Sequence, residues 1–216
     1  MCNRYTPGER ETITRHFGAR ALRDFNAGPP IVHPREPGWV VRLIDGEPVL
    51  DQMTWGFPVR IRGARTPAAQ MKPKPVNNAR FDKLTGFWRR WAEQPAQRCL
   101  IPAARYAEAV GKPGQMTTTW LSLKSTPMFA WAGLWGESDG WGTVYTGVMT
   151  HNAPELEHVH DRSPVIIASA EWQTWLTAPL ADLFGFDRPW PAGDVLVEQT
   201  QVLWKEGGRP EAYGLA

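Results

Sequence analysis

The sequence predicts an α+β protein built mainly from antiparallel β-sheet. Many short segments rich in β-branched and aromatic residues are separated by turn residues, with a few short amphipathic segments between them. Strands and helices do not alternate regularly, which disfavours a parallel sheet with crossover helices. With 216 residues and 42% hydrophobic content, we expect one domain, 1–216, with a substantial core; two small domains that share a core are the alternative.

The first elements surround the amino terminus. Cys2 to Tyr5 suits a short strand leading into a turn. Thr6-Pro7-Gly8-Glu9 has the pattern of a helix start, with Thr6 as the cap and Pro7 at the first helical position. Ile13 and Phe17 share one face of this helix, and Gly18 is expected to end it.

The next stretch predicts a rigid loop, a hairpin and a long surface loop. Asn26–Pro30 is restricted by its two prolines. Strands are expected at Val40–Leu43 and Pro48–Phe57, joined by the favoured turn pair Asp45-Gly46. Arg60–Val76 has no clear periodicity, and loops of that length are usually functional or disordered.

A helix is expected over Asp82–Trp91. Its apolar residues fall at the i, i+3, i+4 and i+7 spacing of a buried stripe: Leu84, Phe87, Trp88 and Trp91.

The second half of the chain contains most of the predicted sheet. Ser169 is expected to cap a short helix that contains Trp172 and Trp175, and a further short helix is expected over Pro179–Phe184. Strands are predicted at Cys99–Ile101, Thr118–Leu123, Met128–Trp135, Thr143–Met149, Pro164–Ala168 and Val195–Val202.

Charge is distributed unevenly in a chain of net charge +2. No acidic residue occurs from Gln52 to Phe81, and a local basic block on a nearly neutral protein suggests the path of a polyanion. A solvated loop is the alternative interpretation. The basic residues of the block are Arg60, Arg62, Arg65, Lys72, Lys74 and Arg80.

The cysteine count suits a reducing compartment, and the hydropathy pattern predicts no membrane span. Two cysteines do not make a disulfide framework, and Cys99 lies in an apolar strand, where a buried structural role is expected. No signal peptide and no stretch of 18 apolar residues is seen, so we expect a cytoplasmic protein without a membrane span.

Cys2 directly follows the start methionine. If Met1 is removed, Cys2 carries an α-amine and a thiol on adjacent carbons. Such a 1,2-aminothiol condenses with an aldehyde to an imine, and the thiol then closes a thiazolidine ring. With reference pKa values of about 7.7–8.0 for the amine and about 8.5 for the thiol, both groups are partly reactive near pH 7. The alternative is that a small residue happens to follow the initiator.

Seven short motifs, in one order along nearly the whole chain, resemble the SRAP domain family (SOS response-associated peptidase). They are Met1–Tyr5, Asn26–Pro29, Trp55–Phe57, Asn78–Arg80, Arg98–Glu108, Ala132–Trp135 and His160–Pro164. Four residues depart from the family's usual pattern, and the paired tryptophans that some members carry in the basic loop are absent. The departures are Asn3 for Gly, Asp82 for Glu, Ala109 for Trp and Ser163 for Met.

The resemblance implies a barrel-like core with peripheral helices and a protein that binds single-stranded DNA and crosslinks to abasic sites. It implies a catalytic set of Cys2, Asn78, Glu108 and His160. Glu108 suits proton transfer if burial raises its pKa, His160 titrates near neutrality, and the Asn78 amide can orient the amino terminus. The DNA-binding residues expected are Arg4, Arg60, Arg62, Lys72, Lys74, Arg80, Thr150 and Arg162.

Each of these residues also has a structural interpretation. Glu108 suits a salt bridge, His160 a core histidine and Asn78 a turn. Two other functions remain open: a noncovalent single-strand-binding module, and a thiol peptidase that uses Cys2 with His160 and removes its own Met1. We expect no cofactor, and no metal at Cys2, His151 and His158, because no C-x-x-C pair and no helical H-x-x-x-H pair is present. We also expect a monomer that associates with the nucleoid when it binds DNA.

Overall fold

The computed structural model describes residues 2–60 and 72–206. One of its sheets is fully antiparallel and has four strands in the order β1-β9-β10-β15. β1 lies at one edge and pairs with β9, with Arg4 opposite Ala107. The strands are β1 (Arg4–Thr6), β9 (Arg105–Val110), β10 (Thr117–Leu123) and β15 (Val195–Leu203).

Five strands of the larger sheet close into a barrel. The ring runs β12-β11-β8-β3-β4 through antiparallel pairs, and a short parallel pairing of β4 with β12 closes it. The mainly antiparallel, barrel-like prediction is therefore confirmed. These strands are β3 (Pro37–Ile44), β4 (Glu47–Trp55), β8 (Arg98–Ala103), β11 (Phe129–Ser138) and β12 (Gly142–His151).

Shorter elements surround the barrel. β7 and β13 pair with β12, β14 pairs with β11, β2 pairs with β4, and β5 pairs with β6. The short strands are β2 (Arg20–Ala21), β5 (Phe57–Val59), β6 (Lys74–Val76), β7 (Asn78–Arg80), β13 (Arg162–Pro164) and β14 (Ile166–Ile167). The α-helices are α1 (Arg10–Phe17), α2 (Arg89–Ala92) and α3 (Trp172–Thr177). Single 3₁₀ turns or helices occur at Phe81–Lys83, Pro95–Gln97, Pro154–Leu156, Ser169–Glu171, Leu180–Phe186 and Ala192–Asp194.

Alternate residues of the barrel strands belong to two different cores, as the two-residue period of a strand requires. Leu100 packs in the core shared with the helices, where α1 contributes Ile13 and Phe17. Its neighbours Cys99 and Ile101 pack in a second core, which the four-stranded sheet joins. This second core includes Cys2, Tyr5, Trp55, Tyr106, Leu121, Trp131 and Tyr145.

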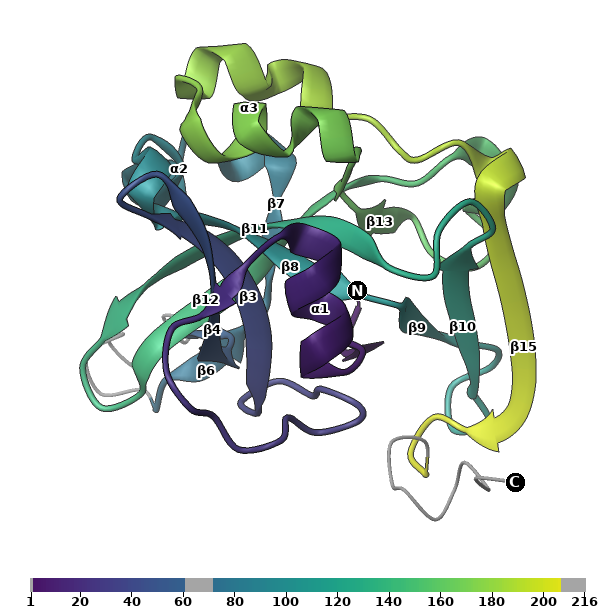
Figure 1. The fold of residues 1–216 in the computed structure, drawn as a ribbon. Helices are drawn as coiled ribbons and strands as arrows, with labels where there is room; N and C mark the ends of the chain where they lie inside the picture. Colours follow the sequence, from purple (N-terminus) through teal and green to yellow (C-terminus); the bar gives the residue numbers. More distant parts are fainter. Residues whose placement is uncertain (1, 61–71, 207–216) are drawn as a thin grey trace.

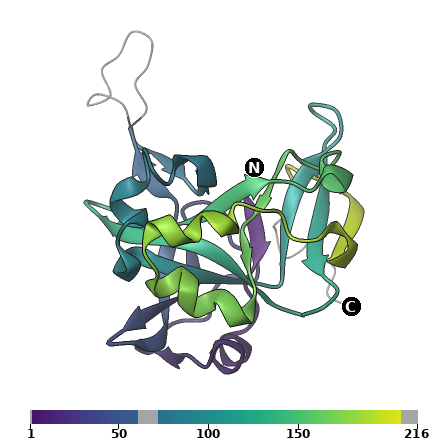
Figure 2. The same ribbon diagram turned by 90° about the horizontal axis from the view of Figure 1, so that it is seen from above.

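β1, the edge strand of the four-stranded sheet, lies beside the barrel. In Figure 2 this purple strand lies between the barrel and the other strands of its sheet, and Figure 1 shows α1 against the barrel and α3 above it. Tyr5 of β1 points into the second core, where its hydroxyl hydrogen-bonds to that of Tyr145. Gly38 approaches both hydroxyls so closely that a Cβ there would collide with them. The segment that carries Cys2 is thus anchored by buried contacts.

Most predicted strands are confirmed, with boundaries that move by one to three residues. In the predicted hairpin, Asp45 and Gly46 both have positive φ (52° and 84°), as a two-residue turn of type I′ requires, and Ile44 pairs with Glu47. Gly18 ends α1 in the left-handed region, as predicted. Cys99 is fully buried.

Several local predictions were wrong. Thr6 belongs to β1 and α1 begins at Arg10, because Gly8 has φ +86°, which is incompatible with a helix. The predicted helix over 82–91 is a 3₁₀ turn followed by the four-residue α2. Gly86 lies between these elements, and Phe87 is 55% exposed instead of buried.

Three further local features differ from the prediction. Part of the expected loop at 60–76 forms β6, and residues 61–71 of that loop lie outside the described residues. Pro164–Ala168 is divided between β13 and β14. Ser169 makes no side-chain cap.

Candidate functional site

Cys2 is fully buried at the start of β1, between the barrel and the four-stranded sheet. Its thiol donates a hydrogen bond to the Arg4 carbonyl oxygen at 3.3 Å. Burial raises the pKa of the Cys2 thiol well above its ordinary value, and the negative charge of Glu108 adds to the effect. The sulfur is therefore a neutral thiol near pH 7.

Two neighbouring asparagine side chains hold the carbonyl group of Cys2. Asn78 Nδ2 donates to the Cys2 carbonyl oxygen at 2.7 Å, and Asn77 Nδ2 donates to the same oxygen at 2.9 Å. Asn78 begins β7, which runs parallel to β12 in the barrel wall. Its Oδ1 is buried without a hydrogen-bond partner in the described part of the chain. Sequence reasoning singled out Asn78 but missed Asn77, for which the adjacent Asn-Asn pair was the available signal.

Glu108 is 2% exposed and lies on β9 opposite Thr119 of β10. Burial raises the pKa of Glu108 from its ordinary 4.5 to about 7. Its carboxyl lies on the same strand face as Tyr106, which packs in the core that contains Cys2. A carboxyl with this pKa can accept and return a proton at neutral pH.

The raised pKa of Glu108 predicts a pH-dependent stability. The folded protein holds the Glu108 proton more tightly than the unfolded chain, so its stabilising effect is complete below pH 4.5 and is lost as pH rises to about 7. We expect this carboxyl to lower the free energy of unfolding by about 3 kcal/mol across that window. Denaturant titrations at several pH values should show the decline in the wild type and a flatter profile in Glu108→Gln. If the free energy of unfolding changes equally with pH in the two proteins, the raised pKa is not that of Glu108.

His160 lies in the loop between Leu156 and β13. Asn152 Nδ2 donates to the His160 carbonyl oxygen at 2.9 Å, which fixes the loop, and the backbone N–H of Arg162 donates to His160 Nδ1 at 3.0 Å. Burial lowers the pKa of His160. Because Nδ1 accepts the hydrogen bond from Arg162, the proton of the neutral ring is on Nε2. The Asp161 carboxylate lies 2.8 Å from Nδ1 and forms an ion pair with the ring only when the imidazole is protonated.

The loop of His160 lies within electrostatic reach of Glu108. The Asp161 charge contributes, after burial, to the raised pKa of Glu108. The structure thus brings Cys2, Asn78 and Glu108 together and sets the His160 loop beside them.

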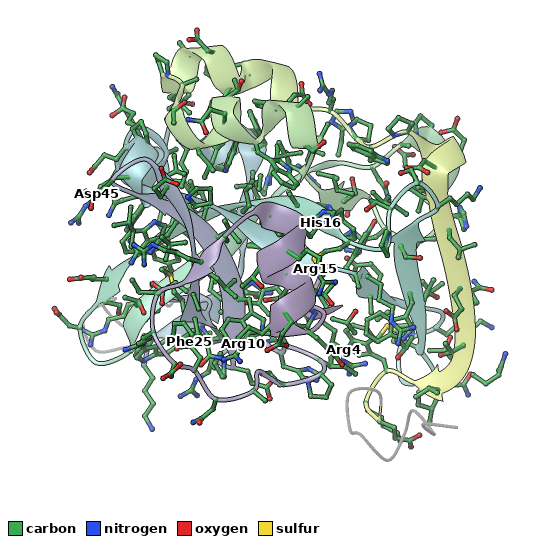
Figure 3. The ribbon with its side chains drawn as sticks, in the orientation of Figure 1. Arg4, Arg10, Arg15, His16, Phe25 and Asp45 are labelled. Carbon is green, nitrogen blue, oxygen red and sulfur yellow. The ribbon has the colours of Figure 1, made fainter. Side chains whose placement is uncertain are left out.

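The prediction that Arg4 is presented to phosphate was wrong. Arg4 is 7% exposed, its guanidinium lies 3.7 Å from the ring centroid of Trp204, and it donates to Thr118 Oγ1 and to the Trp204 carbonyl oxygen. Figure 3 shows Arg4 in the space between α1 and the end of β15. These contacts tie β1 to β10 and to the segment after β15, which is a structural role.

Thr150 also departs from its predicted DNA-binding role. It is fully buried, and its hydroxyl donates to Asp187 Oδ1 at 2.7 Å, so it links β12 to the Asp187 loop. No local sequence pattern pointed to Asp187 as its partner.

The other predicted DNA-binding residues lie closer to the surface. Arg80 ends β7, two residues after Asn78, and its exposed side chain pairs with Asp82 at 2.8 Å. Arg162 begins β13, and its side chain is 24% exposed. Arg60, Lys72 and Lys74 are exposed, and Arg62 lies outside the described residues.

The described residues form neither a metal-binding cluster nor a membrane-spanning helix. Over residues 2–60 and 72–206, no group of three or more His, Cys, Asp or Glu side chains is arranged to hold a metal ion. None of the helices formed by these residues has the length and apolar character needed to cross a bilayer.

Comparison with known proteins gives a family and several curated relatives. A family model described as SOS response associated peptidase (SRAP) matches residues 1–192. Abasic site processing protein YoqW of Bacillus subtilis (strain 168) is 31% identical over 117 residues, covering 50% of this chain and 52% of that protein. Abasic site processing protein YobE of the same organism is 32% identical over 142 residues, covering 58% and 61%. The match thus spans between about half and three fifths of the length of these curated relatives.

Solved structures share the fold. A crystal structure of a protein from Bordetella bronchiseptica is 25% identical with a TM-score of 0.75, covering 92% of this chain and 99% of that one. A protein from Bacteroides thetaiotaomicron has the same TM-score at 16% identity, covering 92% and 91%, which is a likeness of fold alone.

Proposed function

This chain belongs to the SOS response associated peptidase (SRAP) family, and we propose that it processes abasic sites by capturing them covalently through Cys2 in single-stranded DNA. The observation that carries the proposal is the placement of the second residue of the chain. Two amide groups hold the carbonyl of Cys2, and Glu108, whose pKa is about 7, is buried in the same region. A second residue with an incidental role needs neither arrangement. The names of the relatives supply the substrate class.

The proposed reaction proceeds through attack by the amine, loss of water and ring closure by the thiol. The neutral α-amine of processed Cys2 attacks the aldehyde carbon of the open-chain abasic sugar and gives a carbinolamine. Protonated Glu108 donates to the departing hydroxyl and water leaves, after which the nitrogen loses its proton to the Glu108 carboxylate and the imine forms. The thiol sulfur then adds to the imine carbon, its proton passes to the nitrogen, and the thiazolidine ring closes.

The roles of Asn78 and His160 follow from the same contacts. Asn78 Nδ2 holds the Cys2 carbonyl, and its buried Oδ1 is suited to accept a hydrogen bond from the Cys2 amine. Neutral His160, with its proton on Nε2, is suited to donate to the ring oxygen of the sugar as the ring opens.

The state of the Cys2 thiol favours this chemistry over general thiol proteolysis. A thiol peptidase needs a thiolate, usually produced by a low pKa. Burial raises the pKa of Cys2 instead. In the proposed reaction the amine attacks first, and the thiol adds later to an electrophilic imine. This order does not require a preformed thiolate. We propose that any peptidase activity is directed mainly at Met1 of the same chain.

Met1 processing is a direct requirement of the mechanism. The α-amine of Cys2 exists only after Met1 is removed, so we expect the mature active chain to begin at Cys2. Intact mass spectrometry of purified protein should show the loss of one methionine. Active protein that retains Met1 would rule out thiazolidine formation at Cys2.

The DNA path is proposed along the basic segment that leads into the site. Lys72 and Lys74 flank the start of β6, and the chain then reaches Asn78 and Arg80 on β7 within a few residues. Phosphates placed along this path would bring an abasic sugar to Cys2. We propose that the protein acts as a monomer on nucleoid DNA in the cytoplasm, without a cofactor.

Charge reversal in this segment should weaken DNA binding. We expect Lys72→Glu with Lys74→Glu to lower affinity for intact single-stranded oligonucleotide and to reduce the salt slope, which is about −0.7 per phosphate neutralised. Arg89→Glu with Arg90→Glu on α2 is the matched control and should leave binding near the wild-type value. Fluorescence anisotropy at several salt concentrations measures both. Unchanged affinity in the Lys72/Lys74 variant would exclude this path.

The covalent step separates the proposal from a noncovalent binding module. Abasic and intact single-stranded oligonucleotides of one sequence are each mixed with the protein and resolved on a denaturing gel after heating. The proposal predicts a shifted band with the abasic strand alone. Equal noncovalent affinity for both strands and no shifted band would support the noncovalent module instead.

A further inference from the structure

We infer that Asn77 and Asn3 form a positioning pair that fixes the direction of the Cys2 α-amine. The inference rests on the proposed function, because it concerns the nucleophile of that reaction. It adds two positioning residues to the site, neither of which is proposed to touch the abasic sugar. Asn3 is also the position at which this chain departs from the glycine that is usual in the family.

The side-chain amide of Asn77 contacts both Cys2 and Asn3. Its Nδ2 carries two hydrogens. One is directed to the Cys2 carbonyl oxygen at 2.9 Å and the other to Asn3 Oδ1 at 3.1 Å. With Asn78 Nδ2 at 2.7 Å, the Cys2 oxygen accepts one hydrogen bond for each of its two lone pairs. Asn3 Oδ1 also sets the amide orientation of Asn77, because the flipped amide would turn its single oxygen toward both acceptor oxygens.

The backbone of Asn77 is itself held by the barrel. Its carbonyl oxygen accepts from Trp55 Nε1 at 2.9 Å and from the Gly147 backbone N–H at 3.1 Å. Trp55 is fully buried on β4, and Gly147 lies on β12. The Cys2 carbonyl is therefore fixed relative to the barrel strands β4 and β12.

Tetrahedral geometry converts these contacts into control of the amine. The Cα of Cys2 bears the carbonyl carbon, Cβ, hydrogen and the amine nitrogen. The carbonyl is held by Asn77 and Asn78, and the direction of Cβ is held by the thiol hydrogen bond to the Arg4 carbonyl. With two substituents fixed at an L-residue, the direction of the nitrogen follows. A terminal residue without this arrangement would rotate freely and lose the orientation on which addition to the aldehyde depends.

The test compares Asn77→Ala, Asn3→Gly and the double variant. Single-turnover adduct formation is measured over a range of concentrations of abasic oligonucleotide, with affinity for the intact oligonucleotide and the thermal midpoint measured in parallel. We expect Asn77→Ala to lower the saturating rate about tenfold, the scale of one neutral hydrogen bond. The half-saturating concentration, the affinity for intact DNA and the shape of the pH–rate profile should stay unchanged.

Coupling between the two residues provides the sharper readout. Asn3→Gly alone should lower the rate about twofold, because it frees the Asn77 amide to rotate but leaves its bond to Cys2 possible. Since Asn3 acts through Asn77, the double variant should react as slowly as Asn77→Ala and no slower. Additive losses would overturn the pair, as would a wild-type rate in Asn77→Ala.

Two outcomes distinguish this inference from the proposed function. If the wild type forms no adduct, the proposed function fails before any variant is compared. If the wild type reacts and the variants match it, only the positioning pair fails. Should Asn77→Ala not fold, Asn77→Ser keeps a small polar side chain that cannot reach both acceptors and is expected to show the same tenfold loss, on the scale of one hydrogen bond.

Discussion

Cys2→Ser should abolish the heat-stable adduct with abasic single-stranded DNA while a borohydride-trappable imine still forms. Serine keeps the α-amine, so attack on the aldehyde and loss of water proceed. Its hydroxyl can close only an oxazolidine, which hydrolyses more readily than a thiazolidine. The persistent imine also permits β-elimination, so strand cleavage at the abasic site should rise. A time course on denaturing gels, with and without borohydride, follows all three products.

The second cysteine supplies the control for this experiment. Cys99 is fully buried on β8, with its sulfur against Gly133, and has no proposed role in the reaction. Cys99→Ala should form the stable adduct at the wild-type yield. If Cys2→Ser gives as much heat-stable adduct as the wild type, ring closure by Cys2 is wrong and another nucleophile must be sought.

Glu108→Gln should slow adduct formation by about 10²–10⁴-fold, the usual range for general acid–base catalysis. Glutamine keeps the shape of the side chain and both nucleophiles of Cys2, but it cannot transfer the proton that releases water. The slow product should still be a thiazolidine, and affinity for intact DNA should barely change. Because the pKa of Glu108 is about 7, we expect single-turnover rates of the wild type between pH 5 and 9 to show an inflection near pH 7, which Glu108→Gln should lose.

Glu198→Gln is the matched control for this prediction. Glu198 lies on β15 in the same sheet as Glu108, but its side chain is 61% exposed and faces Arg105 at 3.7 Å. Its replacement should leave the rate unchanged. A wild-type rate in Glu108→Gln would make Glu108 structural and transfer its proposed role to His160.

Local patterns predicted the strands well because each strand carries its own signal. β-Branched and aromatic residues marked the strands of the barrel, and the Asp45-Gly46 turn fixed one hairpin register. Closure of the barrel depends on β4 meeting β12, a pairing between residues about ninety positions apart that no local pattern encodes. The predicted helix at 82–91 failed because an i, i+3, i+4, i+7 spacing was given more weight than Gly86 inside it.

The sequence singled out Cys2, Asn78 and Glu108 but not the residues that hold them in place. Asn78 and Glu108 came from motifs, and the structure places them with Cys2. Asn77 escaped notice because its role depends on two contacts across the fold, with Cys2 and Trp55. Arg4 was assigned to phosphate from its residue type, whereas its partner Trp204 lies 200 positions away in the sequence.

Intact mass spectrometry of the protein mixed with an abasic single-stranded oligonucleotide decides whether Cys2 captures the abasic sugar. We expect one new species whose mass equals that of the chain beginning at Cys2 plus the oligonucleotide, minus one water. This mass should persist after heating and should not gain two hydrogens with borohydride, because a thiazolidine contains no imine to reduce. Peptide mapping should place the modification on Cys2. An adduct on another residue, or no covalent species with protein that binds the strand, would contradict the account.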